Sequence, residues 1–195
     1  FVESAAEMLA CRKDICFGMH TMLNAEWDRV KWGPVGLPYA GMEQGNLLAG
    51  KGRESLPVRV GQVNPLVDEN GYFLPDPSLF LQTKPTVEQI MREVEAQLER
   101  LHKLGFDIRY IDSHMFSEAC VPGMDEAMEE FARKKGLVDH MYFYHLLPNM
   151  RRLLEHAGDM AAWLGAVPDG QYFIVVHPSL DTEEMRRTGN AGVSG

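Results

Sequence analysis

The apolar residues of this chain alternate between a helical spacing and short strand-like runs, and this alternation constrains the fold more than any other feature. In residues 86–104 they recur at steps of three and four, the spacing of one buried helical face (Val87, Ile90, Val94, Leu98 and Leu101). Further helices are expected over residues 1–10, 124–135 and 150–164. Runs rich in β-branched and aromatic residues indicate strands at residues 15–19, 108–111, 141–144 and 172–176. This order predicts an α/β fold with a parallel sheet covered by helices, either an open doubly wound sheet or a barrel.

The ends of the two clearest helices carry signals of their own. Thr86, followed three residues later by Gln89, has the pattern of a capping box. Gly105 and Gly136 stand where a left-handed residue commonly ends a helix. These signals agree with the boundaries that the apolar spacing predicts.

The segment from Thr21 to Pro85 interrupts the alternation, because it is rich in Gly, Pro and Asn and keeps no sustained period. An irregular segment of such length within one domain is usually functional. We therefore expect it to pass over the active-site end of the sheet, with a small hairpin around Asn70 and Gly71.

Three of the apolar runs end in a histidine, namely His20, His114 and His177. The carboxyl ends of parallel strands lie along one edge, where ligands bind in open α/β sheets and active sites lie in barrels. Imidazole and carboxylate are the usual ligands of a catalytic divalent ion, so His20 and His114 would form most of a metal site. Residues two apart on a strand share a face, so Asp112 is expected beside His114, as a ligand or as a group that orients a histidine. The competing interpretation is that each histidine is a hydrogen-bonded structural residue.

Composition and length exclude several classes of protein. The formal net charge of -9 argues against a nucleic-acid partner, because such binding draws its affinity from clustered Lys and Arg. No apolar run is long enough to span a bilayer, so no membrane partner is expected. Three cysteines without a Cys-x-x-Cys pair favour reduced thiols and a cytoplasmic location. The length favours one domain that spans residues 1–195, and the sequence leaves open whether the chain forms a homodimer.

One near-match to a nucleotide-binding motif fails on its details. Residues 45–52 follow the phosphate-binding loop G-x-x-x-x-G-K-[ST] except at the last position, where Gly52 has no hydroxyl for magnesium. No apolar strand precedes the loop, and Pro57 follows too soon for the required helix. A plain loop is the better interpretation.

Three segments of the chain together resemble the signatures of the YdjC-like carbohydrate deacetylase family. Each combines a histidine with neighbours at a fixed spacing, and their order agrees with the family over most of the chain. The segments are Gly18-Met19-His20 with Leu23 and Glu26-Trp27, Gln97 with Asp112-Ser113-His114, and Val176-His177-Pro178 with Asp181.

The resemblance implies a metal-dependent hydrolase that removes an acetyl group from an N-acetylated sugar or oligosaccharide, on a distorted (β/α) barrel. His20 and His114 would ligate a divalent metal ion, magnesium or zinc. Asp112 and His177 would be catalytic, with His177 as acid or electrostatic stabiliser. Glu26 and Trp27 would contact the small-molecule carbohydrate substrate. The Trp27 indole has two interpretations, stacking on a pyranose face or anchoring the loop by burial.

The chain departs from the family pattern at both ends. The family's first signature, an Asp-Asp pair on an N-terminal strand, has no counterpart in the sequence, and its final helices have none after Gly195. We therefore expect the deacetylase domain to lack its first strand and final helices in this chain, as part of a longer protein. Without the Asp-Asp pair, the alternative to an enzyme is a sugar-binding or regulatory relative without turnover. A metal-dependent sugar isomerase is a third candidate, but that chemistry usually needs more carboxylate ligands than these strands offer.

Overall fold

Parallel strand pairing organises the part of the chain that is described. The structure is a computed structural model, and it describes residues 2–36, 64–139, 144–148 and 159–189. One sheet has the order β1-β2-β3, with both pairings parallel: β1 (Phe17–Thr21), β2 (Ile108–Ser113) and β3 (Val138–Asp139). A second parallel pair joins β4 (His145–Leu146) to β5 (Tyr172–Phe173).

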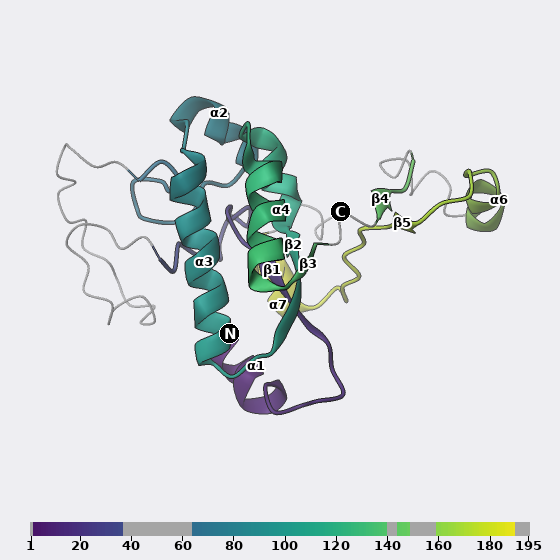
Figure 1. Cartoon of the computed structure of the whole chain (residues 1–195), viewed down its shortest axis with the longest axis horizontal. Helices are drawn as coiled ribbons and strands as arrows, with labels where there is room; N and C mark the ends of the chain where they lie inside the picture. The colour runs from purple at the N-terminus through teal and green to yellow at the C-terminus, as the bar shows by residue number, and fades with distance from the viewer. Residues whose placement is uncertain (1, 37–63, 140–143, 149–158, 190–195) are drawn as a thin grey trace.

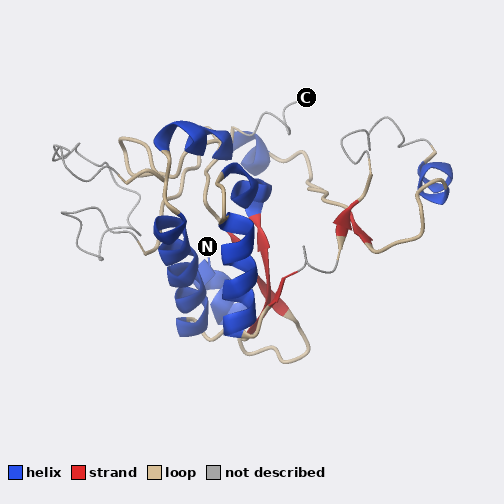
Figure 2. Cartoon of the chain, turned by 45° about the horizontal axis from the view of Figure 1, so that its top comes forward, coloured by secondary structure: helices blue, strands red, loops and turns tan. Residues whose placement is uncertain are grey.

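Helices cover one face of the three-stranded sheet. The two longest, α3 (Val87–Lys103) and α4 (Met124–Lys135), lie side by side in front of the strands (Figure 2). The pair β4 and β5 projects from this body as an arm that ends in α6 (Figure 1). The remaining helical segments are α1 (Val2–Leu9), η1 (Pro77–Leu79), α2 (Phe80–Thr83), η2 (His114–Cys120), α6 (Met160–Gly165) and α7 (Glu183–Arg187).

The predicted α/β class with parallel strands is confirmed. The described strands form one sheet of three and one of two, and they close no barrel. Within the same residues, no helix combines the length and apolar character that crossing a bilayer requires.

The two long helices form where their local signals predict. In α3 the Thr86 hydroxyl accepts from the Gln89 N–H at 3.2 Å, and the Gln89 side chain accepts from the Thr86 N–H at 2.9 Å, which completes the capping box. The α4 helix ends at Gly136, whose φ of 69° is left-handed. Apolar residues of α3 and α4 and of the sheet then meet in one core, among them Ile90, Val94, Leu98, Met124, Met128, Phe131, Met19 and Ile111.

A β-bulge in β2 sets which side chains reach the open face of the sheet. Phe17 pairs with Ile108, but Gly18 pairs with Tyr110, so Arg109 is an extra residue in the ladder. The extra residue resets the alternation, and Ile108 and Ile111 are therefore both buried although they lie three positions apart. Beyond the bulge, the face away from the helices carries the more exposed residues of β2.

Other predicted helices and strands are only partly described or are shorter than expected. The start of the predicted helix 150–164 and most of the predicted strand 141–144 lie outside the described residues. The predicted strand 172–176 is short, because only Tyr172 and Phe173 pair and Val176 is exposed. The hairpin around Asn70 and Gly71 is present as an antiparallel bridge between Val67 and Phe73.

Two polar side chains of α3 hold the irregular segment against the helix. The fully buried carboxylate of Glu93 accepts from the N–H groups of Val35 at 2.8 Å and Gly36 at 2.7 Å. Gln97 accepts from the Met22 N–H at 3.0 Å and donates to the Met22 carbonyl at 2.8 Å and to Glu93 at 2.8 Å. We call Glu93 and Gln97 the α3 clasp, since together they fix the backbone on both sides of residues 23–34.

Glu93→Gln tests the clasp. An amide cannot accept at both of its ends, so at least one of the three N–H groups loses its acceptor in a part-buried position. We expect the free energy of unfolding to fall by about 2–3 kcal/mol, measured by urea denaturation. Glu99→Gln, on an exposed turn of the same helix with Lys103 3.6 Å away, should change it by no more than about 0.5 kcal/mol. Equal effects of the two variants would contradict the assignment.

Candidate active site

The site begins with a histidine and an aspartate on neighbouring strands. His20 on β1 and Asp112 on β2 are register partners, so their side chains leave the open face of the sheet side by side. The Nδ1 atom of His20 lies 2.7 Å from Oδ1 of Asp112. A carboxylate only accepts hydrogen bonds, so the Nδ1–H of His20 donates to Asp112, and Nε2 faces away from this carboxylate.

The second histidine reaches the same place from a turn. Strand β2 ends at Ser113, and His114 opens η2, where Met115 and Phe116 have left-handed φ values of 54° and 52°. Such backbone costs about 1–3 kcal/mol per residue and is concentrated at functional sites. Nδ1 of His114 lies 3.2 Å from Nε2 of His20, with the two rings nearly perpendicular at 82°. Asp112 and His114 both contact His20, so the two side chains point to the same place, as predicted for residues two apart.

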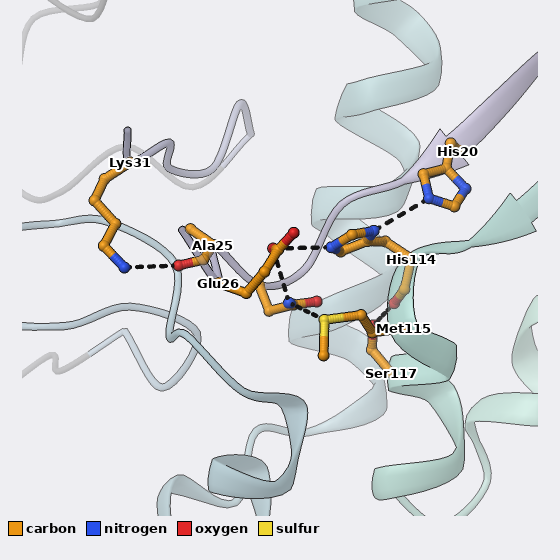
Figure 3. A network of polar contacts seen from close by, with 8 residues as sticks. His20, Ala25, Glu26, Lys31, His114, Met115 and Ser117 are labelled. Atoms are coloured by element: carbon orange, nitrogen blue, oxygen red, sulfur yellow. Dashed lines mark hydrogen bonds and ion pairs between the residues drawn. The ribbon is translucent and has the colours of Figure 1, made fainter. Parts of the chain in front are cut away.

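A second carboxylate engages the far side of His114. Oε2 of Glu26 lies 3.0 Å from Nε2 of His114, so this ring carries its proton on Nε2 (Figure 3). The same oxygen accepts from Nδ2 of Asn24 at 3.4 Å, and Asn24 also donates to the Met115 sulfur at 3.0 Å. Asn24 is fully buried. The result is a continuous chain of contacts from Asp112 through the two imidazoles to Glu26.

The loop that carries Glu26 is fixed by its backbone. The α3 clasp holds Met22, two residues after His20. The Ala25 N–H donates to the Leu74 carbonyl at 2.9 Å, and Lys31 donates to the Ala25 carbonyl at 2.9 Å (Figure 3). Glu26 thus follows a residue that is anchored at both of its peptide groups.

The two facing nitrogens are suited to a cation. Nε2 of His20 and Nδ1 of His114 face each other at 3.2 Å, while the other nitrogen of each ring faces a carboxylate. Either a proton shared between the two nitrogens or a metal ion bound to both would satisfy this contact. Nitrogens that bind one Zn²⁺ tetrahedrally, each at about 2.0–2.1 Å, lie about 3.4 Å apart, so the spacing fits. No group of three or more His, Cys, Asp or Glu side chains in the described ranges is arranged to hold an ion.

The other predicted site residues lie elsewhere or make other contacts. The Trp27 ring packs edge-on against Trp32 at 5.7 Å between centroids, and Trp32 in turn packs against the core. His177 lies in the exposed segment after β5, and no hydrogen bond or ion pair within the described ranges joins it to His20 or His114. Asp181 pairs with Arg186 of α7 at 2.6 Å, and this guanidinium lowers the pKa of the carboxyl. The predicted roles of Trp27 and His177 in substrate binding and catalysis stay predictions.

Two contributors to the site were not recognised as such from the sequence. Asn24 is an isolated polar residue in an irregular segment, and no spacing marks it as the donor that supports Glu26. Gln97 belongs to the family signature, but nothing in its helical position shows that it binds the backbone of Met22. The local signal for Gln97 is that it and the buried Glu93, four positions apart, are polar residues on a mostly apolar face of α3.

The fold and the site together define a class: a parallel α/β protein whose histidines and carboxylates gather at the carboxyl edge of the sheet. Sequence comparison then gives the family. The family described as YdjC-like protein matches residues 1–193, and the chain belongs to it. This membership supports a function related to carbohydrate deacetylases. A search of curated proteins gives no match.

Asp112→Asn tests whether the outer carboxylate matters for cation binding. The Asn carbonyl still accepts from Nδ1 of His20, but the negative charge is lost, so the facing nitrogen becomes a weaker ligand. We expect the affinity for Zn²⁺, measured by competition with a chromophoric chelator, to fall about 10-fold or more. Asp107→Asn removes an exposed carboxylate that lies before the same strand and pairs with Arg109. It should leave the affinity unchanged, and an equal loss in both variants would refute the role of Asp112.

Proposed function

We propose that this chain is a metal-dependent hydrolase that removes the acetyl group from an N-acetylated sugar or oligosaccharide. The observation that carries the proposal is the pair of facing imidazole nitrogens at 3.2 Å, each ring with a carboxylate on its other nitrogen. Membership of the YdjC-like family supports the same chemistry. His20 and His114 would hold the ion, magnesium or zinc, and the remaining coordination would come from water or other residues.

His20 and His114 would hold the divalent cation, which would supply an activated water and stabilise the negative charge that develops on the acetyl oxygen. The residues of the chain have separate tasks around it. Asp112 and Glu26 hold the two rings in one tautomer each, so that both facing nitrogens are ready to bind. His177 is the proposed acid that returns a proton to the leaving sugar nitrogen. The resemblance assigns the general base to an Asp-Asp pair that no position in residues 1–195 supplies.

We also propose which residue contacts the sugar. A half-buried indole at Trp27 offers an apolar face next to Glu26, which suits the face of a pyranose ring. A neutral sugar also suits a chain with a formal net charge of -9, because it is not repelled. We assign Trp27 to substrate binding.

We also infer that the parallel strands belong to the distorted barrel of the family. The helices α3 and α4 cover one face of the sheet (Figure 2). Tyr110 and His20, on β2 and β1, are exposed. In a barrel the uncovered face is the interior, and the ends of its strands carry the active site. The site described here lies at that edge.

Metal removal and replacement tests the proposed activity. Full-length protein that carries the complete family signature, stripped of metal and reloaded with Zn²⁺ or Mg²⁺, should release acetate from N-acetylated oligosaccharides only after reloading. His114→Ala should lower the rate by at least about 100-fold, since several kcal/mol of charge stabilisation depends on the ion. His102→Ala, on the exposed side of α3, is the matched control and should keep full activity.

The outcomes separate the candidate functions. Sugar binding without acetate release, in protein that carries the complete family signature, would favour the non-catalytic relative. Conversion between aldose and ketose would favour the isomerase. Unchanged acetate release by His114→Ala would refute the assignment of the site.

A further inference from the structure

The two histidines of the site present different ring nitrogens to each other. His20 turns Nδ1 to Asp112 and Nε2 inward, whereas His114 turns Nε2 to Glu26 and Nδ1 inward. The difference arises because one ring leaves a strand beside its carboxylate, and the other leaves a turn and meets a carboxylate from a distant loop, 88 positions away in sequence. The ligating atom of each ring is therefore set by where its carboxylate lies.

We propose that Glu26 is a positioning residue that makes His114 bind the metal ion through Nδ1, while His20 binds it through Nε2. This inference rests on the proposed function, since it concerns the same ion. It goes further because it names the ligating atoms and assigns Glu26 to the orientation of His114.

Rotation of the His114 ring shows why Glu26 decides the ligating atom. A half-turn about the bond between Cβ and the ring exchanges Nδ1 with Cδ2 and Nε2 with Cε1. Carbon would then face both His20 and Glu26, so the contacts of 3.2 Å and 3.0 Å would both be lost. The side chain of His114 is only 13% exposed, so water cannot readily replace the lost partner. The bond to Glu26 therefore selects one ring orientation and one tautomer together.

Glu26 is itself held in place for this task. Its Oε2 atom accepts from both His114 and the fully buried Asn24. The preceding residue, Ala25, is fully buried and is bound through its N–H to Leu74 and through its carbonyl to Lys31. A carboxylate fixed in this way loses little conformational entropy when it orients a ring.

The test reads the ligating atoms directly. Two-bond ¹H–¹⁵N correlation spectra of the ¹⁵N-labelled full chain, recorded without metal and with Zn²⁺, distinguish the proton-bearing nitrogen of each imidazole from the metal-bound one. Replacement of Zn²⁺ by ¹¹³Cd²⁺ adds a scalar coupling from the metal to the ring protons. We expect an Nε2–H ring bound through Nδ1 for His114, and an Nδ1–H ring bound through Nε2 for His20.

Variants of Glu26 separate positioning from a general structural role. In Glu26→Ala, the affinity for Zn²⁺ should fall about 10- to 100-fold, because the His114 ring loses the acceptor that fixes its orientation and its Nε2–H. In Glu26→Gln the amide oxygen still accepts from Nε2, so binding through Nδ1 should be kept with a smaller loss of affinity. Glu69→Gln changes an exposed carboxylate in the turn next to Asn70, and it should change neither the affinity for Zn²⁺ nor the nitrogen through which His114 binds.

The results distinguish failure of this inference from failure of the proposed function. Zn²⁺ bound through Nε2 of both rings, or unchanged affinity in Glu26→Ala, would overturn the role of Glu26 and leave the metal site standing. If Zn²⁺ perturbs neither ring in the full chain, the metal site and the inference are both overturned. The spectra of the unmodified protein decide the ligating atoms even where a variant fails to fold.

Discussion

The parallel pairing of β1 with β2 is the interaction on which the rest of this structure depends. It joins residues that are 92 positions apart, and its last steps place His20 opposite Asp112. The pairing is stabilised largely by the burial of apolar side chains, because the inward residues of both strands pack in the same core as the apolar face of α3. The bulge at Arg109 then fixes the phase of β2, so that Ile111 points into the core and Asp112 points to the site. The core and the site consequently lie on opposite faces of the same pair of strands.

The sequence predicts most reliably what local patterns determine. Helices α3 and α4 begin and end where apolar spacing, the capping box and Gly136 place them, because these signals act within a few residues. The convergence of His20, Asp112 and His114 is predicted because parallel strands share one carboxyl edge. The position of β1 is less accurate, since Ile15 is exposed and the strand begins at Phe17. A run of apolar residues does not by itself show which of them find a strand partner.

The parts that escape prediction are contacts between irregular segments. Glu26 is 88 positions from His114 and belongs to no strand or helix, so no period indicates that the two side chains meet. The bulge at Arg109 and the left-handed backbone at Met115 and Phe116 are likewise invisible in the pattern, because none of these residues is a glycine. The predicted strand 172–176 shows the converse error: Ile174 and Val176 are apolar and β-branched, yet they are exposed in the described structure. Apolar character predicted a strand, but pairing also requires a partner edge.

The charges around the facing nitrogens connect this geometry to the kind of ion that it favours. Asp112 and Glu26 each bring a negative charge within one imidazole ring of the gap, and both rings are neutral when each carries the single proton that its carboxylate accepts. A proton shared across the gap would offset only half of that charge, whereas a divalent cation would offset all of it. It would also bind to both lone pairs at once, which a proton at this 3.2 Å separation does less well. In the proposed metal site, the same outer carboxylates would strengthen the ligands and fix their tautomers, so selection of the ion and orientation of the rings would follow from one arrangement.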